Sequence, residues 1–112
     1  MAMTPSTMAW LLLLAAGLLE IVWAVALKQS DGFARLWPSV IGIGMAATSF
    51  VLLTLALKTL PMGTAYAVWV GIGASGVALF GMIMLGEQAT PARLGFLALI
   101  AIGVAGLKAL EA

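Results

Sequence analysis

Glu20 is the residue of this sequence whose type and place most clearly suggest chemistry. It lies twelve residues after Met8 inside an apolar stretch, about 18 Å along a helix and near the middle of a membrane-spanning segment. A carboxylate at that depth is costly and usually has a function. Desolvation disfavours its charged form and a bound cation favours it, so we expect a proton and a cation to compete for Glu20. The alternative is a neutral glutamic acid that hydrogen-bonds a neighbouring helix and only stabilises the fold.

Aromatic residues occur at helical spacing around this carboxylate and in another apolar segment. Trp23 follows Glu20 by three residues, and Tyr66 and Trp69 are also three apart, so each pair shares a helix face. Aromatic rings attract cations most strongly where water is excluded, and Tyr and Trp can donate to a carboxylate. We therefore predict that Trp23, Tyr66 and Trp69 line a cation site. The alternative, an aromatic belt at the membrane surface, better suits the tryptophans near segment ends.

Ser49 is a polar residue near the middle of the second apolar segment. A lone serine in a membrane helix commonly donates to the carbonyl four residues earlier on its own helix. The other possibility is a hydrogen bond to Glu20, which would place Ser49 in the lining of the same site. The sequence leaves both open.

Three glycines, Gly71, Gly73 and Gly76, form a G-x-G-x-x-G string in the third apolar segment. The string does not predict a dinucleotide site, because no strand–helix–strand unit surrounds it. In an apolar helix, glycines allow a neighbouring helix to approach closely or allow the helix to bend. We regard these three as a possible helix bend.

The composition determines what kind of element must position these residues. Of 112 residues, 64% are hydrophobic and 8% are charged, against about 25% charged in an average soluble domain. The mean hydropathy is +1.22. These values exclude an ordinary soluble domain, and a net charge of +1 without a basic patch argues against nucleic-acid binding. Because the chain has no Cys and no His, we expect no cofactor and no metal site.

Four apolar segments account for most of the chain, and each is long enough to cross a bilayer as a helix of about 20 residues. We therefore predict an all-α integral membrane protein in the cell (inner or plasma) membrane. Residues 1–7 would be an N-terminal extension, and residues 8–112 a single four-helix transmembrane domain. Thr90 is a plausible N-cap for the last helix. The predicted spans are residues 8–27, 37–57, 62–85 and 92–110.

The positive charges near the segment ends are almost balanced across the membrane. Lys28, Arg35 and Arg93 would lie on one side, and Lys58 and Lys108 on the other. An excess of Lys and Arg on one side of the membrane sets the orientation of a membrane protein. An excess of one residue favours neither orientation strongly. The count favours insertion in both orientations, although a single orientation stays possible. Two antiparallel copies would supply the inverted halves that many transporters use for alternating access.

The sequence resembles the small multidrug resistance family, and most closely its guanidinium exporter subtype. The motifs that carry this likeness are residues 20–24 (EIVWA), 28–33 (KQSDGF), 37–39 (WPS) and 63–73 (GTAYAVWVGIG). The likeness extends from about Met8 to Leu110. One departure is Val70, where a threonine is expected in this subtype. Lys108 also fits the subtype, although by itself it is most simply a side chain that snorkels to the headgroups.

The resemblance implies a transporter rather than an enzyme. It implies an antiparallel, dual-topology homodimer that exports guanidinium ion, and small substituted guanidinium ions, by proton-coupled antiport. Glu20 of both copies would bind protons and substrate, and the fourth helix would form the dimer contact. The remaining site residues implied are Trp23, Ser49, Tyr66 and Trp69.

Guanidinium suits such a site because it is planar and its paired N–H groups match a carboxylate in bidentate geometry. Two other functions stay open at this stage. One is proton-coupled export of quaternary ammonium and other drug cations. The second is a proton-carrying or structural subunit of a larger membrane complex.

Overall fold

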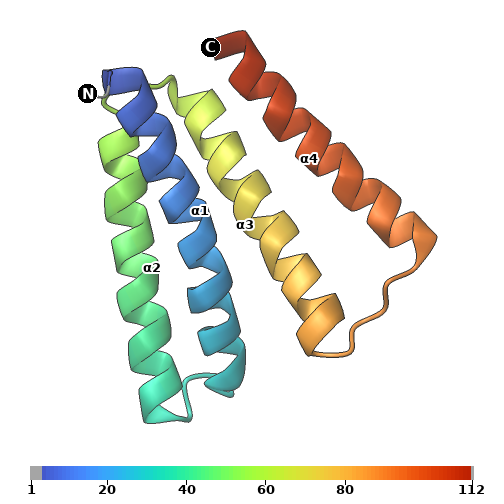
Figure 1. Ribbon diagram of the computed structural model, residues 1–112. Coiled ribbons are helices and arrows are strands. Elements are labelled where there is room, and N and C mark those ends of the chain that lie inside the picture. The colour runs from blue at the N-terminus through green and yellow to red at the C-terminus, as the bar shows by residue number, and fades with distance from the viewer. Residues whose placement is uncertain (1–3, 112) are drawn as a thin grey trace.

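The computed structural model describes residues 4–111, which form four α-helices and no strand (Figure 1). Each helix has between 21 and 25 residues and is long and apolar enough to cross a membrane. The prediction of an all-α protein with four membrane-spanning helices is thereby confirmed. The helices are α1 (Pro5–Gln29), α2 (Leu36–Ala56), α3 (Met62–Met84) and α4 (Pro91–Glu111).

Helix α1 begins three residues before the predicted span. Thr4 is its N-cap and accepts a hydrogen bond of 3.1 Å from the backbone N–H of Thr7, and Pro5 occupies the first turn. Residues 5–7 of the predicted extension therefore belong to the helix, whereas residues 1–3 lie outside the described residues. The division into an extension and a membrane domain stays a prediction. Helix α4 has the expected cap, since the Arg93 N–H donates to Thr90 Oγ1 at 3.1 Å.

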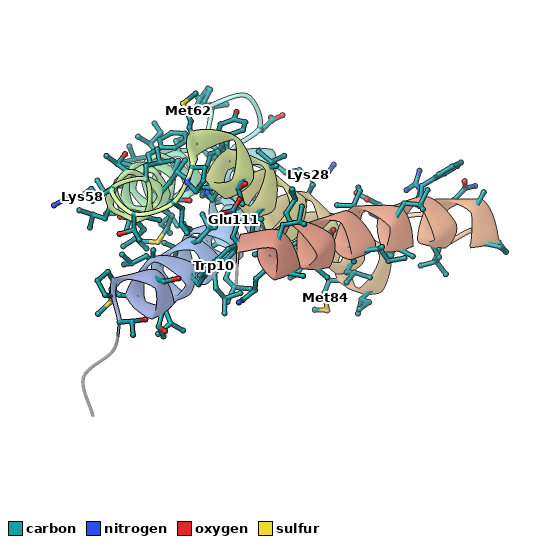
Figure 2. The ribbon with its side chains drawn as sticks, turned by 90° about the horizontal axis from the view of Figure 1, so that it is seen from above. Trp10, Lys28, Lys58, Met62, Met84 and Glu111 are labelled. Carbon is teal, nitrogen blue, oxygen red and sulfur yellow. The ribbon has the colours of Figure 1, made fainter. Side chains whose placement is uncertain are left out.

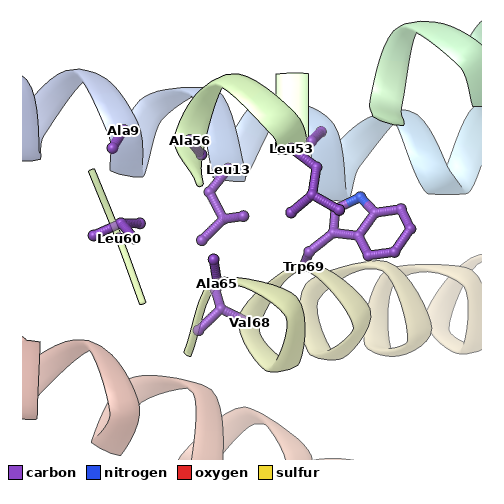
Figure 3. Close-up of a cluster of buried hydrophobic side chains, with 9 residues drawn as sticks. Ala9, Leu13, Leu53, Ala56, Leu60, Ala65, Val68 and Trp69 are labelled. Atoms are coloured by element: carbon purple, nitrogen blue, oxygen red, sulfur yellow. The ribbon is translucent and has the colours of Figure 1, made fainter. Parts of the chain in front are cut away.

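Helix α1 is the centre of the bundle and packs against both α2 and α3. The core lies where these three helices meet (Figure 3), and Leu13 and Val68 are almost completely buried within it. Glycine brings α1 and α2 together at one point, because a Cβ at Gly42 would lie 2.7 Å from Leu27 Cδ2. Burial in a three-helix core fixes how α1 and α3 are rotated about their axes, and this rotation places Glu20.

The turn between α1 and α2 is organised by Ser30. Its hydroxyl donates to the Leu27 carbonyl at 2.6 Å and accepts from the Phe33 N–H at 3.1 Å. Asp31, Gly32 and Phe33 have φ values of 53°, 67° and 67°, in the left-handed region. Non-glycine residues seldom adopt this conformation. The buried serine thus holds a sharp turn that starts α2 beside the end of α1.

Helix α4 differs from the others because none of its described residues is buried. It packs against α3 near its C-terminal end, and the two helices diverge toward Pro91, where α4 begins (Figure 1). Gly71 is the close-contact point, since a Cβ there would overlap the Val104 side chain. The rest of α4 exposes large apolar side chains, including Leu94, Phe96, Leu99, Ile102 and Leu110. In a membrane protein these side chains face lipid or another copy of the chain.

Candidate functional site

Glu20 lies on α1 with its carboxyl group directly against Gly73 of α3. A Cβ at Gly73 would overlap the carboxyl group, so only glycine leaves room for it. The Glu20 Oε1 atom is buried and has no hydrogen-bond partner among residues 4–111. Buried polar atoms are paired in the great majority of cases. This carboxyl oxygen is therefore free to bind a proton or a ligand.

The glycines of α3 act as close-contact positions along the seam between α1 and α3. A Cβ at Gly76 would lie 2.5 Å from Ile21 Cδ1, one residue beyond the Glu20 contact with Gly73. Gly71 faces α4 instead, as described above. Helix α3 is continuous through all three glycines, and a bend there stays a prediction. The seam brings the two backbones close enough for Glu20 to reach α3.

Ser49 makes neither of the hydrogen bonds considered from the sequence. Its hydroxyl donates to the carbonyl of Ala16 on α1 at 2.7 Å, not to its own helix and not to Glu20. It also accepts a hydrogen bond of 3.0 Å from Trp69 Nε1. Helix α2 is rotated so that Ser49 faces α1 and is completely buried. The Ala16 carbonyl of α1 is the acceptor that its hydroxyl meets there. Ser49 therefore ties α1, α2 and α3 together and orients the Trp69 indole.

Trp69 is also held by two aromatic neighbours. The Tyr66 ring lies 5.5 Å from it at an interplanar angle of 59°, and the Phe50 ring lies at the same distance at 57°. Tilted contacts at such distances are favourable for aromatic pairs. Trp69 is 5% exposed, whereas Tyr66 and Phe50 are 55% and 50% exposed. The buried Trp69 indole thus packs against two half-exposed rings, those of Tyr66 and Phe50.

Sequence reasoning did not identify Phe50 as part of this cluster. As one apolar residue in an apolar helix it has no distinguishing feature, and its place beside Ser49 was the only available signal. Ser75 was also passed over, and its spacing gave no signal, because residues two apart on a helix do not share a face. Its hydroxyl oxygen is buried and has no hydrogen-bond partner.

Trp23 lies on α1 one turn after Glu20 and is half-buried. Its Nε1 is another buried polar atom for which the described part of the chain offers no hydrogen-bond partner. The indole N–H is a donor only, whereas the Glu20 carboxylate is an acceptor. Near mid-helix, α1 thus carries an unpaired donor one turn from an unpaired acceptor.

The structure brings some of the predicted site residues together more tightly than others. Glu20 is joined to α3 through Gly73, and Ser49 and Trp69 form a hydrogen-bonded pair beside α1. Tyr66 packs on Trp69. Val70 is 39% exposed. That these side chains line a substrate site stays a prediction.

Within the described part of the chain, no group of three His, Cys, Asp or Glu side chains is arranged to hold a metal ion. Most of the charged residues lie at helix ends or in the connecting turns, and Glu20 lies in mid-helix. The chemistry available to this centre is therefore that of one carboxyl group with indole, phenol and hydroxyl groups nearby.

Comparison with known proteins finds similar sequences over most of the chain. Residues 8–100 match the model of the Small Multidrug Resistance protein family. Guanidinium exporters from Salmonella typhimurium, Escherichia coli (strain K12) and Citrobacter freundii are 58%, 57% and 56% identical over 101 residues. Each alignment covers 90% of this chain and 96% of the relative. With four membrane-spanning helices as well, the chain belongs to the small multidrug resistance family and is a multi-pass transporter of the cell membrane, not an enzyme.

Proposed function

We propose that this chain exports guanidinium ion in exchange for protons, as an antiparallel homodimer in which Glu20 of each copy binds either a proton or the cation. The observation that carries the proposal is the Glu20 carboxyl group, which is held against Gly73 with a buried oxygen that has no partner. The relatives named guanidinium exporters, at 56–58% identity, support this choice of substrate.

The chemistry of guanidinium explains why a carboxylate in this setting is suitable. Its N–H groups lie in one plane and donate in pairs to two carboxylate oxygens. Exchange follows from competition, because a protonated Glu20 has lost the charge that holds the cation. A cation arriving from one side displaces the proton, and a proton arriving from the other displaces the cation. Transport then requires that Glu20 is accessible from one side of the membrane at a time, first from one side and then from the other.

The surrounding aromatic groups have separate roles in this proposal. The hydrogen bond from Trp69 to Ser49 fixes the plane of one buried indole. In this proposal that indole holds the half-exposed Tyr66 ring, which packs on it, in place to meet a flat cation. The Trp23 N–H, unpaired in the single chain, is a donor for the Glu20 carboxylate when that group is charged. Small substituents on a guanidinium ion would extend beyond these rings between the helices.

A second copy completes the transporter. One chain has four helices, and none of the described residues of α4 is buried. An inverted copy packed through α4 would bring a second Glu20 to the site and supply the opposite half for alternating access. The near-balance of Lys and Arg, three against two, permits both orientations.

The test is proton-coupled guanidinium exchange by the purified chain in proteoliposomes, with the parent compared to Glu20→Gln. We expect guanidinium to drive proton movement in the parent and no coupled exchange in the variant, because the amide neither ionises nor pairs with the cation. Glu87→Gln is the matched control, since it makes the same chemical change in the α3–α4 connection and should keep parental exchange.

Three results would contradict the proposal. The first is exchange by Glu20→Gln at the parental rate, which would remove the carboxyl group from the mechanism. The second is proton movement driven by a bulky quaternary ammonium ion and not by guanidinium, which would make the chain a drug exporter. The third is an inactive but folded parental dimer, which would favour a subunit of a larger complex.

A further inference from the structure

A groove separate from Glu20 lies between α1, α3 and α4, at the end of the molecule where α1 begins and α4 ends (Figure 1). Its volume is about 570 Å³, within the range of roughly 300–1,000 Å³ for small-molecule sites. Most of its wall is apolar and comes from all three helices. The large apolar side chains of this wall are Leu11, Leu14, Val68, Ile72 and Val104.

One end of the groove is polar and positively charged. Lys108 is the one charged residue among the described residues that line it, and Ser6 and Thr7 contribute hydroxyl groups. The Lys108 Nζ lies 4.9 Å from the centre of the Trp10 ring. Trp10 also lines the groove, and its Nε1 is buried without a hydrogen-bond partner. This end therefore combines a cation with further donors, and none of the described residues in its lining is acidic.

The depth of the groove corresponds to one leaflet of a bilayer. Ser6 and Leu14 lie eight residues apart, which is about 12 Å along α1, and one leaflet contributes about 15 Å of hydrocarbon. Ile72 forms the inner end, because it packs against Gly17, where a Cβ would lie 2.7 Å from Ile72 Cγ2. Glu20 is a further turn along α1, so this groove is not the cation site described above.

We propose that this groove binds one anionic phospholipid, with its phosphate at Lys108 and Trp10 and an acyl chain along the apolar wall. A phosphate beside an ammonium group makes a strong charge-assisted hydrogen bond. Lys and Trp side chains near helix ends lie at the depth of lipid headgroups. The single positive charge of the lining favours a lipid with a net negative headgroup over a zwitterionic one.

Helix α4 of a second copy is a poorer occupant of this groove. The one acidic residue of α4 is Glu111, and its Oε1 already accepts from the Thr64 hydroxyl at 3.3 Å. Seating an apolar α4 face in the groove would cover Lys108 without giving it a negative partner. An anionic lipid supplies both the apolar chain and the missing charge.

The test uses the fluorescence of Trp10 in bilayers that contain no transport substrate. The full chain is reconstituted in zwitterionic lipid with increasing fractions of brominated phosphatidylglycerol or brominated phosphatidylcholine, which quench tryptophans that they contact. The contribution of Trp10 is the difference between the parent and Trp10→Phe. We expect half-maximal quenching of Trp10 at about fivefold less phosphatidylglycerol than phosphatidylcholine, as one Lys near an anionic lipid provides.

Three variants determine whether Lys108 causes the preference. Lys108→Gln should lose it and Lys108→Arg should keep it. Lys58→Gln is the matched control, because it removes one positive charge from the α2–α3 connection, at the end of the molecule where α4 ends (Figure 1). The Lys58 side chain points outward (Figure 2) and does not line this groove. The control should keep the parental preference.

Equal quenching by the two lipids in the parent would overturn the proposal, as would a preference that survives Lys108→Gln. Absence of Trp10 quenching by either lipid would show that protein covers the groove, and would overturn it as well. None of these outcomes depends on guanidinium export, so failure here is distinguishable from failure of the proposed function.

Discussion

Glu20 lies against a glycine, and this determines how the carboxyl group is held. The contact with Gly73 fixes its place on the α1–α3 seam without giving the buried oxygen a hydrogen-bond donor. Ser49 shows the opposite arrangement, because it both donates and accepts. The Glu20 oxygen is thus unpaired among the described residues, whereas the Ser49 hydroxyl is engaged with Ala16 and Trp69.

Gly73→Ala should weaken guanidinium binding, because the new methyl group would push the Glu20 carboxyl out of place. Overpacking typically costs about 1–3 kcal/mol, which corresponds to a loss of affinity of roughly 5- to 150-fold. Titration calorimetry of the purified protein measures it. Gly63→Ala gains the same helix propensity, has no other atom within 4 Å of its new Cβ, and should bind like the parent. Parental affinity in Gly73→Ala would contradict the assigned position of Glu20.

Ser49→Ala should destabilise the fold, because it leaves the buried Trp69 N–H without its acceptor and removes the hydrogen bond that ties α2 to the Ala16 carbonyl of α1. We expect a loss of about 1–2 kcal/mol, since hydrogen bonds between membrane helices have modest net values. Denaturation followed by tryptophan fluorescence measures the change. Thr48→Ala is the control, as Thr48 bonds only the Gly44 carbonyl of its own helix at 2.9 Å, and should have little effect. Equal stability of the two variants would show that the Ser49 bridge contributes nothing.

At the scale of the elements, the helix ends follow from signals in the sequence, and the helix contacts do not. The last three helices begin within one residue of the predicted spans. The start of α1 differs by three residues, although Thr4 followed by Pro5 was a readable cap signal. In contrast, Ser49 has a partner on α1 that spacing within α2 could not reveal. A hydrogen bond between helices depends on how both helices are rotated about their axes. The sequence of one segment shows which residues share a face of that helix, but not which face of another helix they meet.

The whole molecule is a three-helix core with a fourth helix attached at one side. Helix α4 packs on α3 and has no buried residue of its own in the described range. Such a helix adds little to the stability of one chain, because it covers little apolar surface. Its exposed apolar face is understandable if it packs against an inverted second copy, as proposed above.

Labelling should show both orientations of the chain in the cell membrane. The sequence has no Cys, so Gln88→Cys introduces one thiol in the exposed α3–α4 connection. We expect an impermeant maleimide to label about half of the molecules from outside, because the positive charges are nearly balanced. Adding the substitution Ala89→Arg should shift this fraction, because one more positive charge in that connection biases one orientation. Labelling of all molecules from one side in the parent background would contradict the antiparallel dimer.

The sequence by itself determined the properties that are local to one segment. Four apolar runs of membrane length predicted four helices, which the structure confirms. The carboxylate in the middle of the first run predicts where chemistry occurs, and this stays a prediction. Only the tertiary structure decided that Glu20 meets Gly73, that Ser49 joins Ala16 to Trp69, and that Phe50 packs on the same indole. The physical reason is that hydropathy acts on each helix separately, whereas a site is made by the rotation and close approach of several helices together.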